Sequence, residues 1–189
     1  TLKETIFPLS FKYFFTKIAP SISGYPQSLN KIIKQLYDIA FLFDNISAPG
    51  LAIVITSYTK VVAEEIGFRK LQFTDNEALT DTFEACYELA LRNATSPEFR
   101  QLFLGIRNFT NFTISSFNID EATVAAAKVA YLTALIKTDS KVIERYINPN
   151  QIIDWMIQNT DFNKLNKLKK NNPEAFYYWC QALKILNKF

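Results

Sequence analysis

The chain has 189 residues, of which 49% are hydrophobic and 15% aromatic, and this is enough apolar material to bury a sizeable core. It carries a net charge of +3, no histidine and only two cysteines, so the side chains that do most proton transfer and metal binding near neutral pH are missing or scarce. No phosphate-binding loop, nucleophile elbow, metal-ligand cluster or dinucleotide fingerprint takes their place, and the sequence therefore predicts no catalytic, cofactor-binding or metal-binding residue.

The amino-acid composition favours helices. Seventeen Phe and nine Tyr stand against four Gly, which indicates bulky packing with few tight turns. We therefore expect an all-α fold, a compact single-domain array of about eight to ten helices over residues 1–189. Residues 1–24 form an aromatic N-terminal segment that is either buried by the other helices or loosely attached and left to contact a ligand or another chain.

The first helices are predicted from apolar spacing and from end signals. Apolar residues three and four apart predict a buried helix from about Gln27 to Phe43. Pro49 suits the first turn of a second helix, and Gly67 suits the left-handed position that would close it. The β-branched run at 53–56 would favour a strand in isolation, but the length of the apolar segment and both end signals favour a helix.

Two capped helices follow. Thr74 and Glu77 have capping-box spacing ahead of an apolar stripe that ends near Asn93. Ser96 is the predicted cap of a short helix, which we expect Gly105 to end after about two turns.

The second half of the chain begins with an irregular stretch. Residues 106–119 show neither a sustained helical stripe nor strand alternation, so we expect a surface loop there. Asp120 is then predicted to cap a helix at 121–137, whose many alanines would let neighbouring helices approach closely, as in a central helix. Four more helices complete the predicted set: residues 139–146, 149–158, 161–170 and 173–188, with Asn148 and Asn172 as caps before proline.

Four Asn-x-Ser/Thr sequons are the most specific local motif in the sequence. They begin at Asn45, Asn93, Asn108 and Asn111, all at predicted helix ends or in the predicted loop, where a glycan could project. An Asn-rich chain also contains such triplets by chance, so their use stays open. Asn108 and Asn111 are close neighbours, and crowding would leave one of the two unmodified.

Cys86 and Cys180 are either bridged in an oxidising compartment or two small buried hydrophobes. A bridge would tie the last predicted helix to the middle of the chain and would contribute about 4 kcal/mol. No histidine and no CxxC partner accompanies either cysteine, which disfavours a redox or metal role.

Basic charge is concentrated at the C-terminal end, since residues 163–189 hold six Lys against one Glu. Lys164, Lys167, Lys169 and Lys170 either form a basic contact surface or, as is more common for such a run, only make this end of the chain soluble. Leucines interleave with these lysines and an aromatic run follows, which is compatible with contact to a membrane surface. No arginine occurs in this tail, which disfavours nucleic acid as a partner.

The carboxylates and the apolar runs exclude further classes. The local carboxylate clusters have the spacing of solvated helix faces rather than of an acid–base pair; they are Glu64 with Glu65, Asp81 with Glu84 and Glu88, and Asp120 with Glu121. No run of about eighteen apolar residues appears, so no transmembrane span is expected.

The sequons favour a secreted or otherwise exported protein. The chain begins at Thr1 rather than Met, as it would after removal of a targeting peptide, although excision from a longer chain leaves the same sequence. A cytoplasmic or organellar location is the alternative.

Together these observations predict a non-enzymatic helical protein that acts through protein–protein contacts, in a structural, scaffold or assembly role. Its partner would be another protein or further copies of itself. The alternative is a carrier without cofactor that encloses an apolar small molecule, such as a lipid, terpenoid or pigment, in an aromatic-lined helical cavity. A second alternative is an enzyme that works without histidine.

Overall fold

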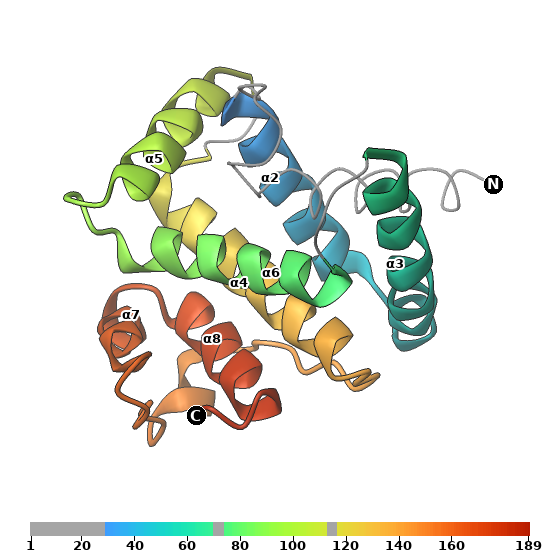
Figure 1. Cartoon of the computed structure of the whole chain (residues 1–189). Helices are drawn as coiled ribbons and strands as arrows, with labels where there is room; N and C mark the ends of the chain where they lie inside the picture. The colour runs from blue at the N-terminus through green and yellow to red at the C-terminus, as the bar shows by residue number, and fades with distance from the viewer. Residues whose placement is uncertain (1–28, 70–73, 113–116) are drawn as a thin grey trace.

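The computed structural model describes residues 29–69, 74–112 and 117–189, and within them the predicted all-α fold is confirmed (Figure 1). These residues contain seven α-helices and three short 3-10 helices, and no strand. The α-helices are α2 (Leu29–Asn45), α3 (Ala48–Arg69), α4 (Asp75–Leu91), α5 (Pro97–Phe109), α6 (Ile119–Lys137), α7 (Leu168–Asn171) and α8 (Pro173–Ile185). The 3-10 helices are η1 (Thr110–Phe112), η2 (Pro149–Ile152) and η3 (Asn163–Lys167).

Helix α6 is the central element, as its alanine content predicted. It packs against α2, α3, α4, α5 and α8. Figure 1 shows it in yellow behind the green α4, with the blue α2 on one side and the red α8 on the other. Every residue from 125 to 136 is buried, which is expected of a helix surrounded by other helices. Its alanines keep the neighbouring helix axes close.

The core between α2, α6 and α8 is aromatic. The Phe43 ring meets the Tyr178 ring edge to face with centroids 5.3 Å apart, and Tyr131 stacks on Tyr178 at 6.0 Å. Pairs of this kind contribute about 0.5–1.5 kcal/mol each beyond the burial of their area. Trp179 on α8 is fully buried beside Phe83 of α4, and this contact joins α4 to the same core.

Four caps predicted from the sequence are present. Thr74 and Glu77 form the capping box of α4, and Ser96 caps α5. Asn148 caps η2 and Asn172 caps α8, each directly ahead of a proline. These residues satisfy backbone N–H groups that the first turn of a helix leaves without partners.

The predicted end of α5 at Gly105 was wrong, and the loop predicted at 106–119 is shorter than expected. Helix α5 continues to Phe109, and η1 follows directly. Ile106 and Phe109 are buried in the core, and their burial outweighs the penalty of about 1 kcal/mol that a glycine brings to a helix.

The start of α6 also differs from the prediction. Asn118, not Asp120, is the cap, because its side-chain oxygen accepts the N–H groups of Asp120 and Glu121. Glu121 returns a bond to the backbone of Asn118 and completes a capping box. Gly67 likewise does not end α3, which continues to Arg69.

The helices predicted in the C-terminal part are mostly shorter in the structure or missing. Residues 139–146 form no helix, and only η2 occurs within 149–158. The stretch 161–170 contains η3 and the single turn of α7, and the last helix ends at Ile185 rather than at Lys188. The short elements η2, η3 and α7 all pack against α8.

Side chains hold the segment 139–148 in its extended course. The Arg145 guanidinium donates to the carbonyls of Phe43 at 2.7 Å and Ile46 at 2.8 Å, at the C-terminal end of α2. The backbone N–H of Glu144 donates to the Tyr131 hydroxyl at 2.9 Å. These bonds take the place of the backbone ladder that a helix would have provided.

Some predictions fall outside the described residues, namely the N-terminal segment 1–24 and the predicted helix start at Gln27. Within the described part of the chain, no helix combines the length and the apolar character that crossing a membrane requires.

Candidate binding groove

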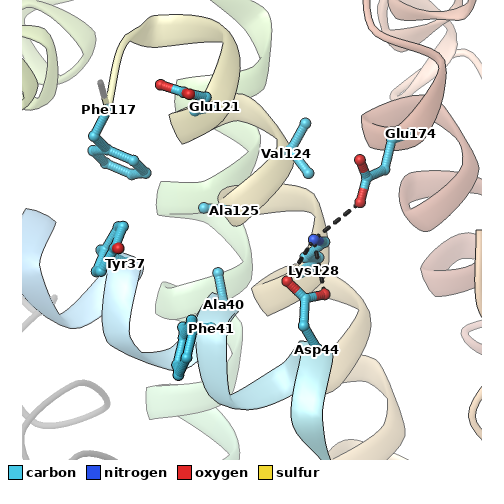
Figure 2. A pocket seen from close by; sticks show the side chains of 10 residues that line it. All are labelled: Tyr37, Ala40, Phe41, Asp44, Phe117, Glu121, Val124, Ala125, Lys128 and Glu174. Atoms are coloured by element: carbon cyan, nitrogen blue, oxygen red, sulfur yellow. Dashed lines mark hydrogen bonds and ion pairs between the residues drawn. The ribbon is translucent and has the colours of Figure 1, made fainter. Parts of the chain in front are cut away.

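A groove of about 270 Å³ opens between α2 and α6 and ends at the start of α8 (Figure 2). Its lining combines aromatic, small apolar and charged side chains. They are Tyr37, Ala40, Phe41, Asp44, Phe117, Glu121, Val124, Ala125, Lys128 and Glu174.

The groove follows from matching faces on two helices. On α2 the lining residues are spaced i, i+3, i+4 and i+7 from Tyr37 to Asp44, and on α6 they have the same spacing from Glu121 to Lys128. Residues with this spacing lie along one helix face. The small side chains of Ala40 and Ala125 leave the space between the two faces unfilled.

Aromatic rings form one end of the groove. The rings of Tyr37 and Phe117 meet edge to face with centroids 5.2 Å apart, and Tyr37 also contacts Phe109 at 5.7 Å. Phe41 is 62% exposed on the rim. An exposed phenylalanine beside an apolar floor provides area that a bound partner would remove from water.

The other end of the groove holds a buried ammonium between two carboxylates, drawn with dashed lines in Figure 2. The Lys128 Nζ lies 2.8 Å from Asp44 Oδ1 and 2.9 Å from Glu174 Oε1. It thereby joins α6 to the end of α2 and to the first turn of α8. Glu174 also lies where a carboxylate interacts favourably with the N-terminal end of a helix.

Lys128 stays protonated in this setting. Burial by itself would lower the pKa of this ammonium group, but the hydrogen bonds and charges of Asp44 and Glu174 outweigh burial, and the pKa is raised. The side chain is therefore a fixed cation and not a proton acceptor.

The groove is acidic overall, although the chain as a whole is basic. Its lining has three carboxylates, from Asp44, Glu121 and Glu174, against the single ammonium of Lys128. Two negative charges therefore remain in excess beside the apolar floor.

The predicted sequon asparagines lie on the surface. Asn45, Asn93, Asn108 and Asn111 are all exposed. Asn45 ends α2, Asn93 lies in the turn after α4, and Asn108 is in the last turn of α5 rather than in a loop. Their exposure is compatible with glycan attachment, and the use of the sequons stays a prediction.

Both cysteines are buried and present as free thiols. Burial raises the pKa of the Cys86 thiol, and it raises that of Cys180 to about 12. Cys86 on α4 and Cys180 on α8 each belong to the hydrophobic core. Burial in the core is compatible with the second of the two roles that the sequence allowed, that of small apolar side chains, and the pairing of the two cysteines stays open.

The four predicted basic residues divide into two kinds. Lys167 donates to the carbonyl of Leu91, at the C-terminal end of α4, and Lys169 donates to two backbone carbonyls of the segment 153–156. Lys164 and Lys170 are exposed. Two of the four therefore stabilise the fold, because ammonium groups satisfy carbonyls that have no helical partner.

The carboxylate clusters do not converge on the groove, with the exception of Glu121. In the cluster on α4, Glu88 accepts from Ser96, whereas one oxygen of Asp81 is buried with no hydrogen-bond partner among the described residues. Burial, with Glu84 nearby, raises the pKa of Asp81.

Sequence reasoning missed Asp44, Lys128 and Glu174 as one site. The available signal was Lys128 itself, which is a charged residue within an otherwise apolar run of α6. A lysine buried at such a position needs a partner of opposite charge. Its partners are 84 and 46 residues away in sequence, and no local spacing connects them.

Fold and groove together define an all-α protein with an open groove that carries an excess of carboxylates. Comparison with known proteins adds no family to this description, because no family model matches the chain and no curated protein or solved structure matches it significantly.

Proposed function

We propose that the protein is a non-enzymatic docking protein whose groove between α2 and α6 binds a basic, apolar segment of a partner protein. The observation that carries this proposal is the combination of an apolar floor, an exposed Phe41 and an excess of carboxylates in one open groove. A segment with apolar side chains flanked by lysine or arginine is complementary to all three.

The size and shape of the groove support a docked side chain or helix rather than an enclosed ligand. At about 270 Å³ it lies at or below the lower end of pockets that enclose drug-sized molecules, roughly 300–1,000 Å³. It is also an open groove and not an enclosed cavity. A carrier for a lipid, terpenoid or pigment would need its apolar cargo covered on most sides.

The charged end of the groove supports binding rather than catalysis. A lysine that acts as a general base or nucleophile needs a pKa lowered toward neutrality, whereas the pKa of Lys128 is raised. Asp44 and Glu174 are engaged with its ammonium group. This arrangement fixes the geometry of the acidic end.

The experiment is a selection of peptides from a displayed random library on the folded protein, followed by affinity measurements on Phe41→Lys. We expect the selected peptides to share apolar residues flanked by Lys or Arg. Phe41→Lys should weaken the binding of these peptides by about tenfold or more, because it removes apolar area and adds a positive charge that repels their Lys and Arg side chains.

The matched control is Ile53→Lys on α3. Ile53 is 65% exposed, close to the value for Phe41, and does not line the groove. Equal affinity of the selected peptides for the wild type and for Phe41→Lys would contradict the proposal. An apolar small molecule bound to protein from its natural source, detected by native mass spectrometry and displaced in Phe41→Lys, would favour the carrier instead.

Export stays a prediction. The exposure of all four sequon asparagines supports it, while two buried thiols do not require an oxidising compartment. The mass of the protein from its natural source, before and after enzymatic removal of N-glycans, tests it directly.

A further inference from the structure

We propose that the C-terminal end of the molecule is a second contact surface, which binds an anionic lipid bilayer. The lysine–aromatic face consists of residues 153–156 together with Lys169, Lys184 and Phe189. The exposed Lys188 precedes Phe189 in sequence, and its ammonium lies 5.6 Å from the centroid of the Phe162 ring. The face lies away from the groove and does not depend on the function proposed for the groove. In Figure 1 the chain end, marked C, lies beside the orange segment that contains η2.

Apolar side chains project from this face. Ile153 is 61% exposed, Met156 58% and Phe189 38%. Lys169 fixes the segment that carries the first two, since its ammonium donates to the carbonyl of Ile153 at 2.6 Å and to that of Trp155 at 2.9 Å. The two aliphatic side chains are therefore presented by an ordered loop and not by a free end.

Trp155 forms the base of the face. Its ring stacks on Tyr177 with centroids 5.5 Å apart, and the Phe189 ring lies 6.3 Å from it. The Lys184 Nζ lies 3.1 Å from the centroid of the Trp155 ring and 4.9 Å from that of Phe189. Aromatic rings next to lysines are typical of the interface between headgroups and acyl chains.

The ammonium groups of this face have no carboxylate partner within the described part of the chain. Among the residues that the structure describes, no ion pair involves Lys169, Lys184 or Lys188. Burial lowers the pKa of Lys184, so its charge is incompletely solvated. A lipid phosphate or carboxylate would supply the missing counter-charge. The exposed carboxylate of Asp154 on the same loop repels anionic headgroups and reduces this attraction.

The side chains of the face favour a bilayer over a nucleic acid. The apolar side chains of Ile153 and Met156 would gain nothing from contact with a phosphate backbone. Both can be buried at the boundary between the headgroups and the acyl chains of a membrane. The Trp155 ring is already in contact with Tyr177 and Lys184, so it is not a free platform on which a base could stack.

The experiment is flotation of the full chain with vesicles of phosphatidylcholine alone or with about 30% phosphatidylserine, in about 0.15 M salt. We expect binding to the anionic vesicles only. Ile153→Ser with Met156→Ser should reduce the partition coefficient by about tenfold or more, because two apolar side chains are lost with no change of charge. Lys184→Gln with Lys188→Gln should reduce it about fivefold for each charge removed.

Matched controls are Ile53→Ser on α3 and the pair Lys60→Gln with Arg100→Gln, which change exposed residues outside the face by the same types of substitution. These variants should float as the wild type does, and so should Phe41→Lys, which separates this surface from the groove. Circular dichroism verifies that every variant remains folded.

Three outcomes would overturn the proposal. The first is equal flotation with neutral and anionic vesicles, or with neither. The second is unchanged flotation of both face variants. The third is binding of polyuridylate that is lost with the lysine pair but kept with the Ile153 and Met156 pair, which would assign the face to nucleic acid.

Discussion

Lys128 is a buried cation whose two partners come from different helices, and its removal should expose their mutual repulsion. We expect Lys128→Met to lower the free energy of unfolding by about 2 kcal/mol, because Asp44 and Glu174 then face each other without an ammonium group. The expected loss is below that of a fully buried pair, since the two carboxylate side chains are 46% and 35% exposed. Urea denaturation measures it.

The triple variant Lys128→Met, Asp44→Asn, Glu174→Gln is the control, and it should recover more than half of that loss. A triple variant as unstable as Lys128→Met alone would show that packing of the lysine stem, not charge, was lost. The pH dependence has a definite sign. Because the folded-state pKa of Lys128 is raised, its contribution is complete below the unfolded value of about 10.4 and disappears only as the pH rises through the folded value.

Asp81 is expected to act in the opposite way, as a residue that costs stability at neutral pH. One of its oxygens is buried without a partner among the described residues, and burial raises its pKa. Asp81→Asn should therefore raise the free energy of unfolding by about 1 kcal/mol at neutral pH. Thermal or urea unfolding of both proteins over a pH series checks this.

The advantage of Asp81→Asn should shrink on acidification. A raised folded-state pKa means that the folded protein binds this proton more tightly, so the wild type gains stability relative to the variant as the pH falls through that pKa. Glu84→Gln is a useful comparison, because Glu84 contributes the smaller part of the shift and its removal should give a smaller gain in the same direction. A pH-independent difference for Asp81→Asn would contradict this explanation.

At the scale of elements, the extended segment 139–148 depends on Arg145. Arg145→Ala removes two hydrogen bonds to carbonyls at the end of α2 and the contact of the guanidinium with the Phe43 ring, at 4.4 Å. We expect a loss of about 2 kcal/mol and faster hydrogen exchange at the amides of Glu144 and Tyr146. Mass spectrometry of deuterated peptides would locate the change.

The control for that prediction is Lys141→Ala, an exposed residue of the same segment, which should leave both stability and exchange unchanged. Arg145→Lys should recover only part of the loss, because a single ammonium cannot reproduce the two-pronged contact of a guanidinium. Uniformly faster exchange across the whole protein would indicate global destabilisation instead of release of this segment.

The elements that sequence analysis identified correctly are those with local end signals. The capping box of Thr74 and Glu77 and the asparagine before Pro173 set the helix starts through short-range hydrogen bonds, which a sequence displays directly. Gly105 misled the prediction because the burial of Ile106 and Phe109 outweighs the weak preference of glycine for helix ends. Gly67 also lies inside a helix, contrary to the prediction.

Elements determined by distant side chains could not be read from the sequence. The segment 139–146 has helical spacing, yet Arg145 and the hydroxyls of Tyr131 and Tyr178 hold it extended by bonds to other parts of the chain. The groove is hidden for the same reason. Both helices were predicted from the sequence, but the pairing of α2 with α6 was not, and without it Lys128 had no visible partners.

At the scale of the whole molecule, the two thiols report on the integrity of the core. Cys86 and Cys180 are both buried on helices that pack against α6. We expect neither to react with a thiol reagent in the native protein and both to react once it is unfolded, since burial raises their pKa and blocks access. The absence of reactive thiols after unfolding under non-reducing conditions would indicate the disulfide that the sequence left open.

The distribution of charge is also a property of the whole chain. An acidic groove lies between α2 and α6, while the lysines near the C-terminal end form no ion pair with the residues that the structure describes. If both proposals hold, the two surfaces bind ligands of opposite charge. Salt should then weaken both interactions, whereas an anionic competitor should displace the bilayer but not a basic peptide.

The two tryptophans occupy contrasting environments, and this gives the molecule an intrinsic optical readout. Trp179 is fully enclosed by the core, whereas Trp155 lies at the surface beneath an ammonium group. Emission from the first should stay constant until the chain unfolds. Emission from the second should move to shorter wavelength when hydrocarbon replaces the water around it, so one unlabelled spectrum distinguishes adsorption from denaturation.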